Sequence, residues 1–357
     1  MSLPIGATIG ILGGGQLGRM LAGAAAKLGF RTVVFAPGAH LPAAQLAGQH
    51  IDANYDDPGA LAAFAATCDV VTLEWENVPV AAMQAIAASG VPVRPGSKAL
   101  GVAQDRLEEK RFLERCGIDC APWRRVDDLQ TLRAAHSEIG PDAILKTRRD
   151  GYDGKGQVRL DTGSDLEAAW AEIGGAAAIL EGFVTFEKEI SVVLARDPLG
   201  QIATYTPSHN EHSGGVLRRS SVPADLSNAT ATDAQAFASH LAEALDYVGV
   251  LALEFFVLSD GSLLANEFAP RVHNSGHWTP EACATGQFEN HIRAVAGWPL
   301  GATDLLHSAV MDNLIGEDVA APLEDLLAGG SLTLYGKREI RPGRKMGHIV
   351  RRLRASA

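Results

Sequence analysis

Hydrophobic positions near the N-terminus form short continuous runs that alternate with alanine-rich helical segments. The stretch TIGILGGGQLGRMLAGAAAKLGFRTVVFAP predicts a strand at residues 9–12, a glycine turn, a helix closed by Gly29 and a second strand at residues 32–35. CDVVTLEWEN predicts a further strand that ends in acidic residues, and VPVAAMQAIAASG predicts another helix. Buried parallel strands read as continuous apolar runs. Residues 1–97 are therefore expected to form an open parallel α/β domain.

The pattern changes beyond residue 97. SKALGVAQDRLEEKRFLERCG predicts a single helix that bridges two domains, with Ser97 as its N-cap, Gly117 as its stop, and Arg106 and Lys110 on one face. From about residue 120 short strands and hairpins dominate, with a helix at ATDAQAFASHLAEALDYVG. The tail GSLTLYGKREIRPGRKMGHIVRRLR alternates as a strand does and is basic.

Length, charge and cysteine content narrow the class of protein. A chain of 357 residues suits two or three packed subdomains. It has no apolar run of about 18 residues and no signal-peptide pattern, so we expect a cytoplasmic protein without membrane contact. The net charge of −11 disfavours nucleic-acid binding. The four cysteines are too few and scattered for a disulfide framework and are expected to be free thiols.

The first glycine cluster fits the pattern G-x-G-x-x-G through Gly13, Gly15 and Gly18. Such glycines let backbone N–H groups approach a phosphate at a helix N-terminus. A dinucleotide is disfavoured, because the second strand lacks an acidic residue where the ribose 2′-OH would be held. The phosphate of another ligand is the favoured interpretation, and a tight turn without a ligand is the alternative.

The second cluster, LKTRRDGYDGKGQVRL, places Lys146 at the end of a strand before Gly151, Gly154 and Gly156. A hairpin of this kind can close over a polyphosphate, with N–H groups and lysines neutralising charge. A solvated basic loop is the alternative. A P-loop is excluded, because G-x-x-x-x-G-K-[ST] does not occur.

A third feature is the hairpin LALEFFVLSDGSLLANEF. If Asp260 and Gly261 form its two-residue turn, Glu254 and Glu267 face each other on adjacent strands, with Cβ atoms about 5 Å apart. Like charges so placed are unfavourable unless a cation lies between them, and Mg²⁺ commonly takes one or two protein carboxylates plus phosphate oxygens. A hairpin face neutralised by a nearby arginine is the alternative.

Two further patterns carry weaker signals. EGFVTFEKEISVVL predicts a linker strand with Glu181 at its start and Glu189 further on, which could meet an adenine edge and ribose hydroxyls. The histidines, including His273 and His277 in the polar cluster NEFAPRVHNSGH, lack the spacing of a zinc site, so hydrogen-bonding roles are favoured.

Seven motifs occur in a fixed order: GGGQLGRM, EWENVP, QDRLEEKRFL, GYDGKGQ, EGFVTFEKEISV, NEFAPRVHNSGHWT and YGK…RPGRKMGHI. Together they resemble the ATP-grasp superfamily and, within it, the N5-carboxyaminoimidazole ribonucleotide synthases of purine biosynthesis. This resemblance implies an N-terminal Rossmann-like α/β domain (1–97), a bridging helix (98–120), a small lid (121–186) and a larger antiparallel-sheet core with a basic C-terminal substrate segment (187–357).

The resemblance also implies a reaction. ATP and bicarbonate would give carboxyphosphate and ADP, and the carboxyl group would pass to the exocyclic amine of 5-aminoimidazole ribonucleotide. One or two Mg²⁺ ions would assist, and a homodimer is implied. Phosphoryl transfer needs mainly alignment and charge neutralisation, which lysines, glycine N–H groups and Mg²⁺ supply.

Site residues are carried over only where the family motifs match. Contacts with ATP are implied for Arg106, Lys146, Gly151, Tyr152, Asp153, Gly154, Lys155, Gly156, Gln157, Glu181, Gly182, Phe183, Val184, Glu189, His212, Asn266 and Glu267. Contacts with the acceptor ribonucleotide are implied for Gly14, Gly15, Gln16, Leu17, Glu74, Asn77, Arg271, His273, Asn274, Ser275, Lys337 and Arg344. Metal ligands would be Glu254 and Glu267. Catalytic roles fall to Arg271, Lys155, Asp153, Tyr152 and Glu74, with Arg271 stabilising the phosphorylated acyl intermediate.

Alternatives remain at this point. The chain departs from the family pattern at His209 and Val272. Another ATP-grasp enzyme, such as a formate-using glycinamide ribonucleotide transformylase, would share most of these motifs. A nucleotide-binding regulatory protein without turnover and a dinucleotide-dependent reductase are further alternatives. Intact Glu254, Glu267 and Arg271 argue against loss of turnover.

Overall fold

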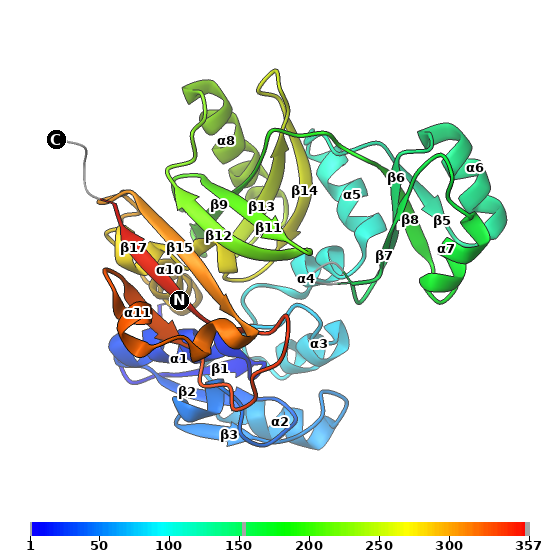
Figure 1. Cartoon of the computed structure of the whole chain (residues 1–357). Coiled ribbons are helices and arrows are strands. Elements are labelled where there is room, and N and C mark those ends of the chain that lie inside the picture. The colour runs from blue at the N-terminus through cyan, green and yellow to red at the C-terminus, as the bar shows by residue number, and fades with distance from the viewer. Residues whose placement is uncertain (1, 152–154, 354–357) are drawn as a thin grey trace.

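The computed structural model describes residues 2–151 and 155–353. Its N-terminal part is a parallel sheet in the order β3-β2-β1-β4, at the base of Figure 1. The strands are β1 (Thr8–Leu12), β2 (Arg31–Phe35), β3 (Gln49–Ile51) and β4 (Val70–Leu73). They are connected by α1 (Gln16–Lys27), η1 (Ala43–Gln45), α2 (Pro58–Ala66) and α3 (Val80–Ala88). Every residue of β1 and β4 is buried, as continuous apolar runs predict, and the parallel α/β domain is confirmed.

The bridging segment forms two helices, α4 (Ser97–Ala103) and α5 (Arg106–Arg115), so the prediction of a single helix is wrong. Asp105 causes the break, because its backbone is extended and its carboxylate accepts from Leu107 N–H at 3.0 Å as the N-cap of α5. Gly96, not Ser97, is the N-cap of α4. Gly117 adopts a left-handed conformation just after α5, as expected of a helix stop.

A small antiparallel sheet forms the lobe at the right of Figure 1. Its strands lie in the order β5 (Trp123–Val126), β8 (Ala178–Gly182), β6 (Ala143–Thr147) and β7 (Gln157–Leu160). Helices α6 (Leu129–Ile139) and α7 (Leu166–Glu172) pack on it, and Leu132, Leu145 and Leu180 lie in their shared core. The hairpin β6–β7 is the predicted glycine-rich lid.

The larger sheet is antiparallel, in the order β14-β13-β9-β11-β12-β15-β17-β16, with β10 paired to β9. Its strands are β9 (Lys188–Arg196), β10 (Ile202–Thr204), β11 (Ser208–Ser213), β12 (Val216–Val222), β13 (Gly249–Val257), β14 (Leu263–Ala269), β15 (Ala309–Ile315), β16 (Ser331–Leu334) and β17 (Lys345–Arg352). The remaining helical elements are α8 (Asn228–Ala244), η2 (Asn274–Gly276), α9 (Thr279–Ala282), α10 (Gln287–Ala296), η3 (Gly316–Ala320) and α11 (Leu323–Leu327). The expected combination of parallel and antiparallel sheets is confirmed.

The parallel sheet and the large sheet share one hydrophobic core through α10. Leu21 of α1, Val250 of β13 and Ile292 of α10 belong to the same buried cluster. His291 joins the two sheets, because its Nδ1 accepts from Val250 N–H at 3.0 Å and its Nε2 lies 2.7 Å from the Thr72 hydroxyl. Nε2 therefore carries the hydrogen and donates to Thr72. This contact fixes the end of β4 relative to β13.

The β13–β14 hairpin differs from its predicted form in two compensating ways. Leu258 N–H donates to Ser262 C=O, so the turn contains three residues rather than the predicted Asp260–Gly261 pair. A bulge between Leu253 and Phe255 then shifts the register by one residue. Leu253 pairs with Phe268, which keeps Glu254 beside Glu267. The predicted juxtaposition of the two carboxylates is confirmed, although the predicted turn is wrong.

The predicted linker strand is also wrong, because EGFVTFEKEISVVL spans two sheets. Glu181 lies near the end of β8, and Glu189 lies near the start of β9. Between them, Glu187 N–H donates to Val257 C=O at 2.9 Å. All four cysteines are free thiols, as expected. Within the described residues, helices long and apolar enough to cross a bilayer are absent.

Candidate active site

The two central carboxylates lie on neighbouring strands, Glu254 on β13 and Glu267 on β14. Burial, reinforced by the Glu267 charge, raises the pKa of Glu254. Burial also acts to raise the pKa of Glu267, but the Arg106 guanidinium, with Nη1 2.8 Å from Glu267 Oε2, lowers it overall. The pKa values of these two neighbouring carboxylates are therefore shifted in opposite directions. Glu267 has a positively charged partner in Arg106, and ionisation of Glu254 beside it would be favoured by a further positive charge.

The donor set fits a hard divalent cation. In the part of the chain that the structure describes, no group of three or more His, Cys, Asp and Glu side chains could hold a metal ion. A pair of carboxylates alone suits Mg²⁺, which usually completes its octahedron with water and substrate phosphates. The alternative prediction, a hairpin face neutralised by a nearby arginine, is confirmed for one carboxylate, since Arg106 pairs with Glu267.

A buried trio of charges lies beside this pair. Glu181 contacts the ammonium of Lys146, and its Oε1 lies 2.9 Å from Lys110 Nζ. Burial alone would raise the pKa of Glu181, but the two lysines outweigh it and lower the pKa. Arg106 and Lys110 do share one face of α5, as predicted, and that face points at β8 and β14.

The lid hairpin approaches the same region. A Cβ atom on Gly151 would lie 3.4 Å from a guanidinium nitrogen of Arg106, at van der Waals contact, so the start of the hairpin lies beside Arg106. Gly156 has a φ of +70°, and a Cβ there would lie 2.5 Å from Thr147 Oγ1. Gln157 begins β7. Lys155 is described, whereas Tyr152, Asp153 and Gly154 lie outside the described residues.

Residues expected to meet the adenine and ribose lie around the end of β8 and the start of β9. Gly182 N–H donates to Pro122 C=O, and Phe183 N–H donates to Asp142 C=O. Val184 follows as a half-buried residue in the largely exposed connection to β9. On the neighbouring strands, His212 Nδ1 lies 2.5 Å from Glu189 Oε2. Although burial acts to lower it, the Glu189 contact raises the pKa of His212.

Glu74 fills the glycine turn that follows β1. Its carboxylate accepts from Gly15 N–H at 2.7 Å and from Gly18 N–H at 3.2 Å. Side chains at Gly13 or Gly15 would collide with it, since Cβ atoms there would lie 2.6 and 2.9 Å from Glu74 Oε1. An acidic side chain at a helix N-terminus satisfies the same N–H groups that a phosphate would. The expected phosphate contact at these two N–H groups is therefore replaced by an internal carboxylate.

The other residues of this turn differ in what they can offer. Leu17 is buried in the core, and its predicted contact with the ribonucleotide stays a prediction. A Cβ on Gly14 would meet Leu41 at 2.3 Å, which explains the glycine. Gln16 begins α1 and is half-buried. Asn77 lies in a loop after β4 that Gln104 holds through the carbonyls of residues 76 and 78.

Arg271 lies close to Glu74 and to the loop that follows β4. One guanidinium nitrogen of Arg271 lies 2.5 Å from Glu76 Oε2, a partner that the sequence did not indicate. Burial raises the pKa of Glu74, whereas the charges of Arg271 and Lys337 act to lower it. The three residues therefore lie close enough to interact, although they come from β4, the end of β14 and the basic tail.

The segment after Arg271 is held mainly by its own side chains. Gln287 accepts from His273 N–H and donates to His273 C=O. Asn274 and Asn313 exchange two amide hydrogen bonds of 3.0 and 2.8 Å. Ser275 is fully buried and accepts from the Ser191 hydroxyl. Because Asn274 and Ser275 are committed inside the fold, their side chains organise the loop, and contact with an acceptor nucleotide stays a prediction.

His273 faces the carboxylates. Its Nδ1 lies 2.8 Å from Ser275 Oγ and 3.7 Å from Glu254 Oε1. Burial, followed by the charges of Arg271 and Lys345, lowers the pKa of His273 to about 3. The ring is therefore neutral at physiological pH. Lys345, at the start of β17, was not predicted as a site residue.

The basic tail is only partly brought to the site. Lys337 Nζ donates to Lys345 C=O at 2.6 Å, and its charge reaches Glu74. Arg344 instead donates to Glu339 C=O at 3.0 Å within the same loop. Asn266 lies beside Glu267, and its carbonyl accepts from Lys110 at 2.7 Å. Three residues that contact the predicted site residues were not predicted as site residues themselves: Glu76, Lys110 and Lys345. The EWEN motif was a signal for Glu76, and the helix face shared with Arg106 was a signal for Lys110.

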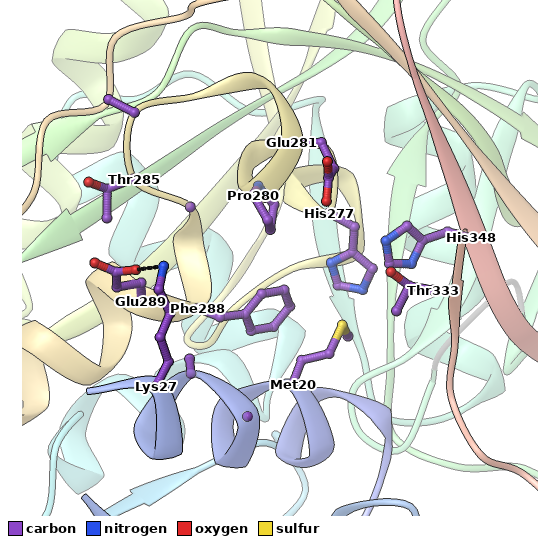
Figure 2. A pocket seen from close by; sticks show the side chains of 14 residues that line it. Met20, Lys27, His277, Pro280, Glu281, Thr285, Phe288, Glu289, Thr333 and His348 are labelled. Carbon is purple, nitrogen blue, oxygen red and sulfur yellow. Dashed lines mark hydrogen bonds and ion pairs between the residues drawn. The ribbon is translucent and has the colours of Figure 1, made fainter. Parts of the chain in front are cut away.

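His277 belongs to a different part of the molecule. It lines a separate cavity of about 310 Å³ between α1, α10 and β17 (Figure 2), together with Met20, Phe288 and His348. Gln287 links the two regions, because its amide also donates to His277 Nδ1 at 3.0 Å. His277 therefore supports the active-site loop from behind.

Comparison with known proteins identifies relatives along the whole chain. The family model of the ribonucleotide synthetase preATP-grasp domain matches residues 6–104, that of the ATP-grasp domain matches residues 111–288, and that of the phosphoribosylaminoimidazole carboxylase C-terminal domain matches residues 309–352. An N5-carboxyaminoimidazole ribonucleotide synthase from Brucella melitensis is 56% identical, with 98% of this chain and 97% of the relative covered. Its counterpart in Bacillus subtilis is 42% identical, with 97% and 91% covered.

Solved structures agree with these relatives. A crystal structure of an N5-carboxyaminoimidazole ribonucleotide synthetase in complex with ADP is 41% identical, has a TM-score of 0.95, and covers 99% of this chain and 94% of its own. An enzyme from Aspergillus clavatus in complex with ADP and 5-aminoimidazole ribonucleotide is 30% identical, has a TM-score of 0.91, and covers 98% and 94%.

Proposed function

The chain belongs to the N5-carboxyaminoimidazole ribonucleotide synthases, ATP-grasp ligases of purine biosynthesis, and from this premise we propose how its residues carry out the reaction. ATP and bicarbonate form carboxyphosphate with release of ADP. The exocyclic amine of 5-aminoimidazole ribonucleotide then takes the carboxyl group, and phosphate leaves with the amine proton. The observation that carries this proposal is the approach of two charged groups, Glu254 and Glu267 with Arg106, and Arg271 with Glu74. His273 lies between these groups, close to Glu254 and within the influence of both Arg271 and Glu267.

Nucleotide binding falls to the half of the site between the lid and the large sheet. Lys146 and Arg106 neutralise phosphate charge, and the lid hairpin from Gly151 closes over the phosphates. Glu189, paired with His212, accepts from ribose hydroxyls. Glu254 and Glu267 would hold Mg²⁺, which supplies charge neutralisation for the transferred phosphoryl group when bound.

Carboxyl transfer falls to the half of the site around Arg271. Its guanidinium stabilises the anionic intermediate, while Glu74 and the glycine turn receive the aminoimidazole. Lys337 binds the ribonucleotide phosphate. The expected roles of Lys155, Tyr152 and Asp153 at the lid remain part of the proposal. The protein is proposed to act in the cytoplasm as a homodimer, which sedimentation analysis would test.

The decisive experiment measures ADP release from ATP with Mg²⁺, bicarbonate and 5-aminoimidazole ribonucleotide. The proposal expects strong stimulation by the ribonucleotide, and a rate that is independent of it contradicts the proposal. Formate in place of bicarbonate is the control, because a transformylase-type enzyme would use it.

We predict that Glu267→Gln and Arg271→Ala each lower kcat by about 100-fold or more, because each removes charge stabilisation from the reacting groups. Far-UV circular dichroism should remain unchanged. A variant of either residue with a near-wild-type rate would show that the site assignment is wrong.

A second prediction separates the two halves of the site. Lys337→Ala should raise the KM for the ribonucleotide at least about tenfold while changing the KM for ATP less, because a lysine–phosphate contact is charge-assisted. Steady-state kinetics with each substrate varied in turn provides the measurement. The opposite ranking would place the ribonucleotide phosphate elsewhere.

A further inference from the structure

Lys110 is a buried ammonium that joins the small sheet to the large one. It is 1% exposed, and its Nζ lies 2.9 Å from Glu181 Oε1, 2.7 Å from Asn266 O and 3.5 Å from Ala265 O. The contact with Glu181 is an ion pair, whereas the two carbonyls accept hydrogen bonds from the ammonium. The carboxylate comes from β8 and the two carbonyls come from β14, and α5 supplies the lysine between them.

The contact with Glu181 governs the charge available at Lys146. Glu181 is ionised, because the two lysines lower its pKa against the opposing effect of burial. With Lys110 present, one carboxylate is shared by two ammoniums and the trio carries a net positive charge. Without Lys110, the carboxylate would neutralise Lys146 alone and would compete with any phosphate for that ammonium.

The contacts with β14 hold the backbone on either side of Glu267. Lys110 donates to the Asn266 carbonyl before it. Glu109, its neighbour on α5, accepts from Phe268 N–H at 2.7 Å after it. The peptide groups on both sides of a proposed metal ligand are therefore fixed by one turn of helix, at the bulge where strand pairing is interrupted.

We propose that Lys110 is a positioning residue for the nucleotide phosphates, which keeps Glu181 from neutralising Lys146 and holds Glu267 in place. This inference rests on the proposed function, in which Lys146 and Glu267 serve the nucleotide. It predicts that loss of Lys110 weakens binding at the phosphate end of the nucleotide and spares the adenosine end.

The test compares binding of MgADP and of adenosine by calorimetry in the wild type and Lys110→Met. We expect MgADP affinity to fall by about tenfold or more, equivalent to about 1.4 kcal/mol, and adenosine affinity to change by less than about twofold. Lys98→Met is the matched control, because Lys98 is exposed on α4, donates to the Ala244 carbonyl at the end of α8, and should leave both affinities unchanged when replaced. Equal MgADP affinity in Lys110→Met and wild type, or an equal loss for adenosine, overturns the proposal.

A double variant keeps the test valid if Lys110→Met does not fold. Lys110→Met combined with Glu181→Gln removes the ammonium together with the carboxylate that it offsets, so the competitor of Lys146 is also absent. The MgADP affinity of this double variant should lie within about threefold of that of Glu181→Gln alone, because no carboxylate is left for Lys110 to offset. A folded double variant that binds MgADP about tenfold or more weakly than Glu181→Gln overturns the proposal. Failure of the wild type itself to bind MgADP would instead contradict the proposed function.

Discussion

At the scale of single residues, Glu254 connects metal binding to pH. Burial and the neighbouring Glu267 charge raise its pKa in the metal-free protein. A cation favours the ionised carboxylate, so Mg²⁺ bound at the proposed site would displace a proton from Glu254. The other charged groups that act on Glu254 are Glu189, His212 and Lys345, of which His212 and Lys345 oppose the rise.

Displacement of a proton from Glu254 by Mg²⁺ can be measured. MgADP should bind with release of up to about one proton at neutral pH, and its affinity should fall as the pH is lowered below the raised pKa of Glu254. Calorimetry in buffers of different ionisation enthalpy measures the proton directly. ADP with EDTA is the control, and equal proton release with and without Mg²⁺ would refute the role of Glu254.

At the scale of elements, His291 sets the distance between β4 and β13. It connects the strand that precedes Glu74 to the strand that carries Glu254, through Thr72 and Val250. Burial lowers the pKa of His291 to about 3, so the ring is neutral and its two nitrogens act as one donor and one acceptor. This imidazole therefore adds a polar contact between β4 and β13 to the hydrophobic core that the two sheets share.

Replacement of His291 by phenylalanine should therefore destabilise the fold. The buried Thr72 hydroxyl and Val250 N–H would lose their partner, at a cost of about 2 kcal/mol or more. Urea denaturation measures the change in the free energy of unfolding. His240→Phe on the exposed side of α8 is the matched control and should have little effect; comparable losses in both variants would contradict the bridging role.

Sequence periodicity predicted elements better than the contacts between them. The β1–turn–α1 unit followed from local patterns of burial and turn chemistry. The predicted proximity of Glu254 and Glu267 was correct only because a bulge offset the wrong turn. The break at Asp105 was not predicted, although its N-cap contact is local. Arg148, which follows β6, also binds that carboxylate, with nitrogen–oxygen distances of 2.9 and 2.6 Å. Such partners are set by tertiary contacts that no local pattern records.

The same limit applies to the candidate site. The glycine turn predicted an anion at the N-terminus of α1, but Glu74 supplies that anion from the end of another strand. Glu76 and Lys110 were not predicted, since their partners Arg271 and Glu181 come from distant parts of the chain. The residue ranges of the domains and the roles of the site residues stay predictions.

At the scale of the whole molecule, the proposed nucleotide site lies between the lid and the large sheet. A ligand held by both should stabilise the native arrangement, because only the folded state presents both sides. MgADP at about 100 times its Kd is expected to add about 2.7 kcal/mol of stability. The midpoint of thermal unfolding should rise with MgADP and rise much less with ADP and EDTA. Equal rises would contradict the proposal that the site holds a metal ion.

The docking of α5 on β14 has a consequence for solubility. β14 is the terminal strand of the large sheet, and the outer edge of such a strand can pair with a strand of another molecule. Here Glu109, Lys110 and the Asp119 carbonyl take its outward N–H and C=O groups. The contacts that prepare the site for a nucleotide therefore also protect this edge against aggregation.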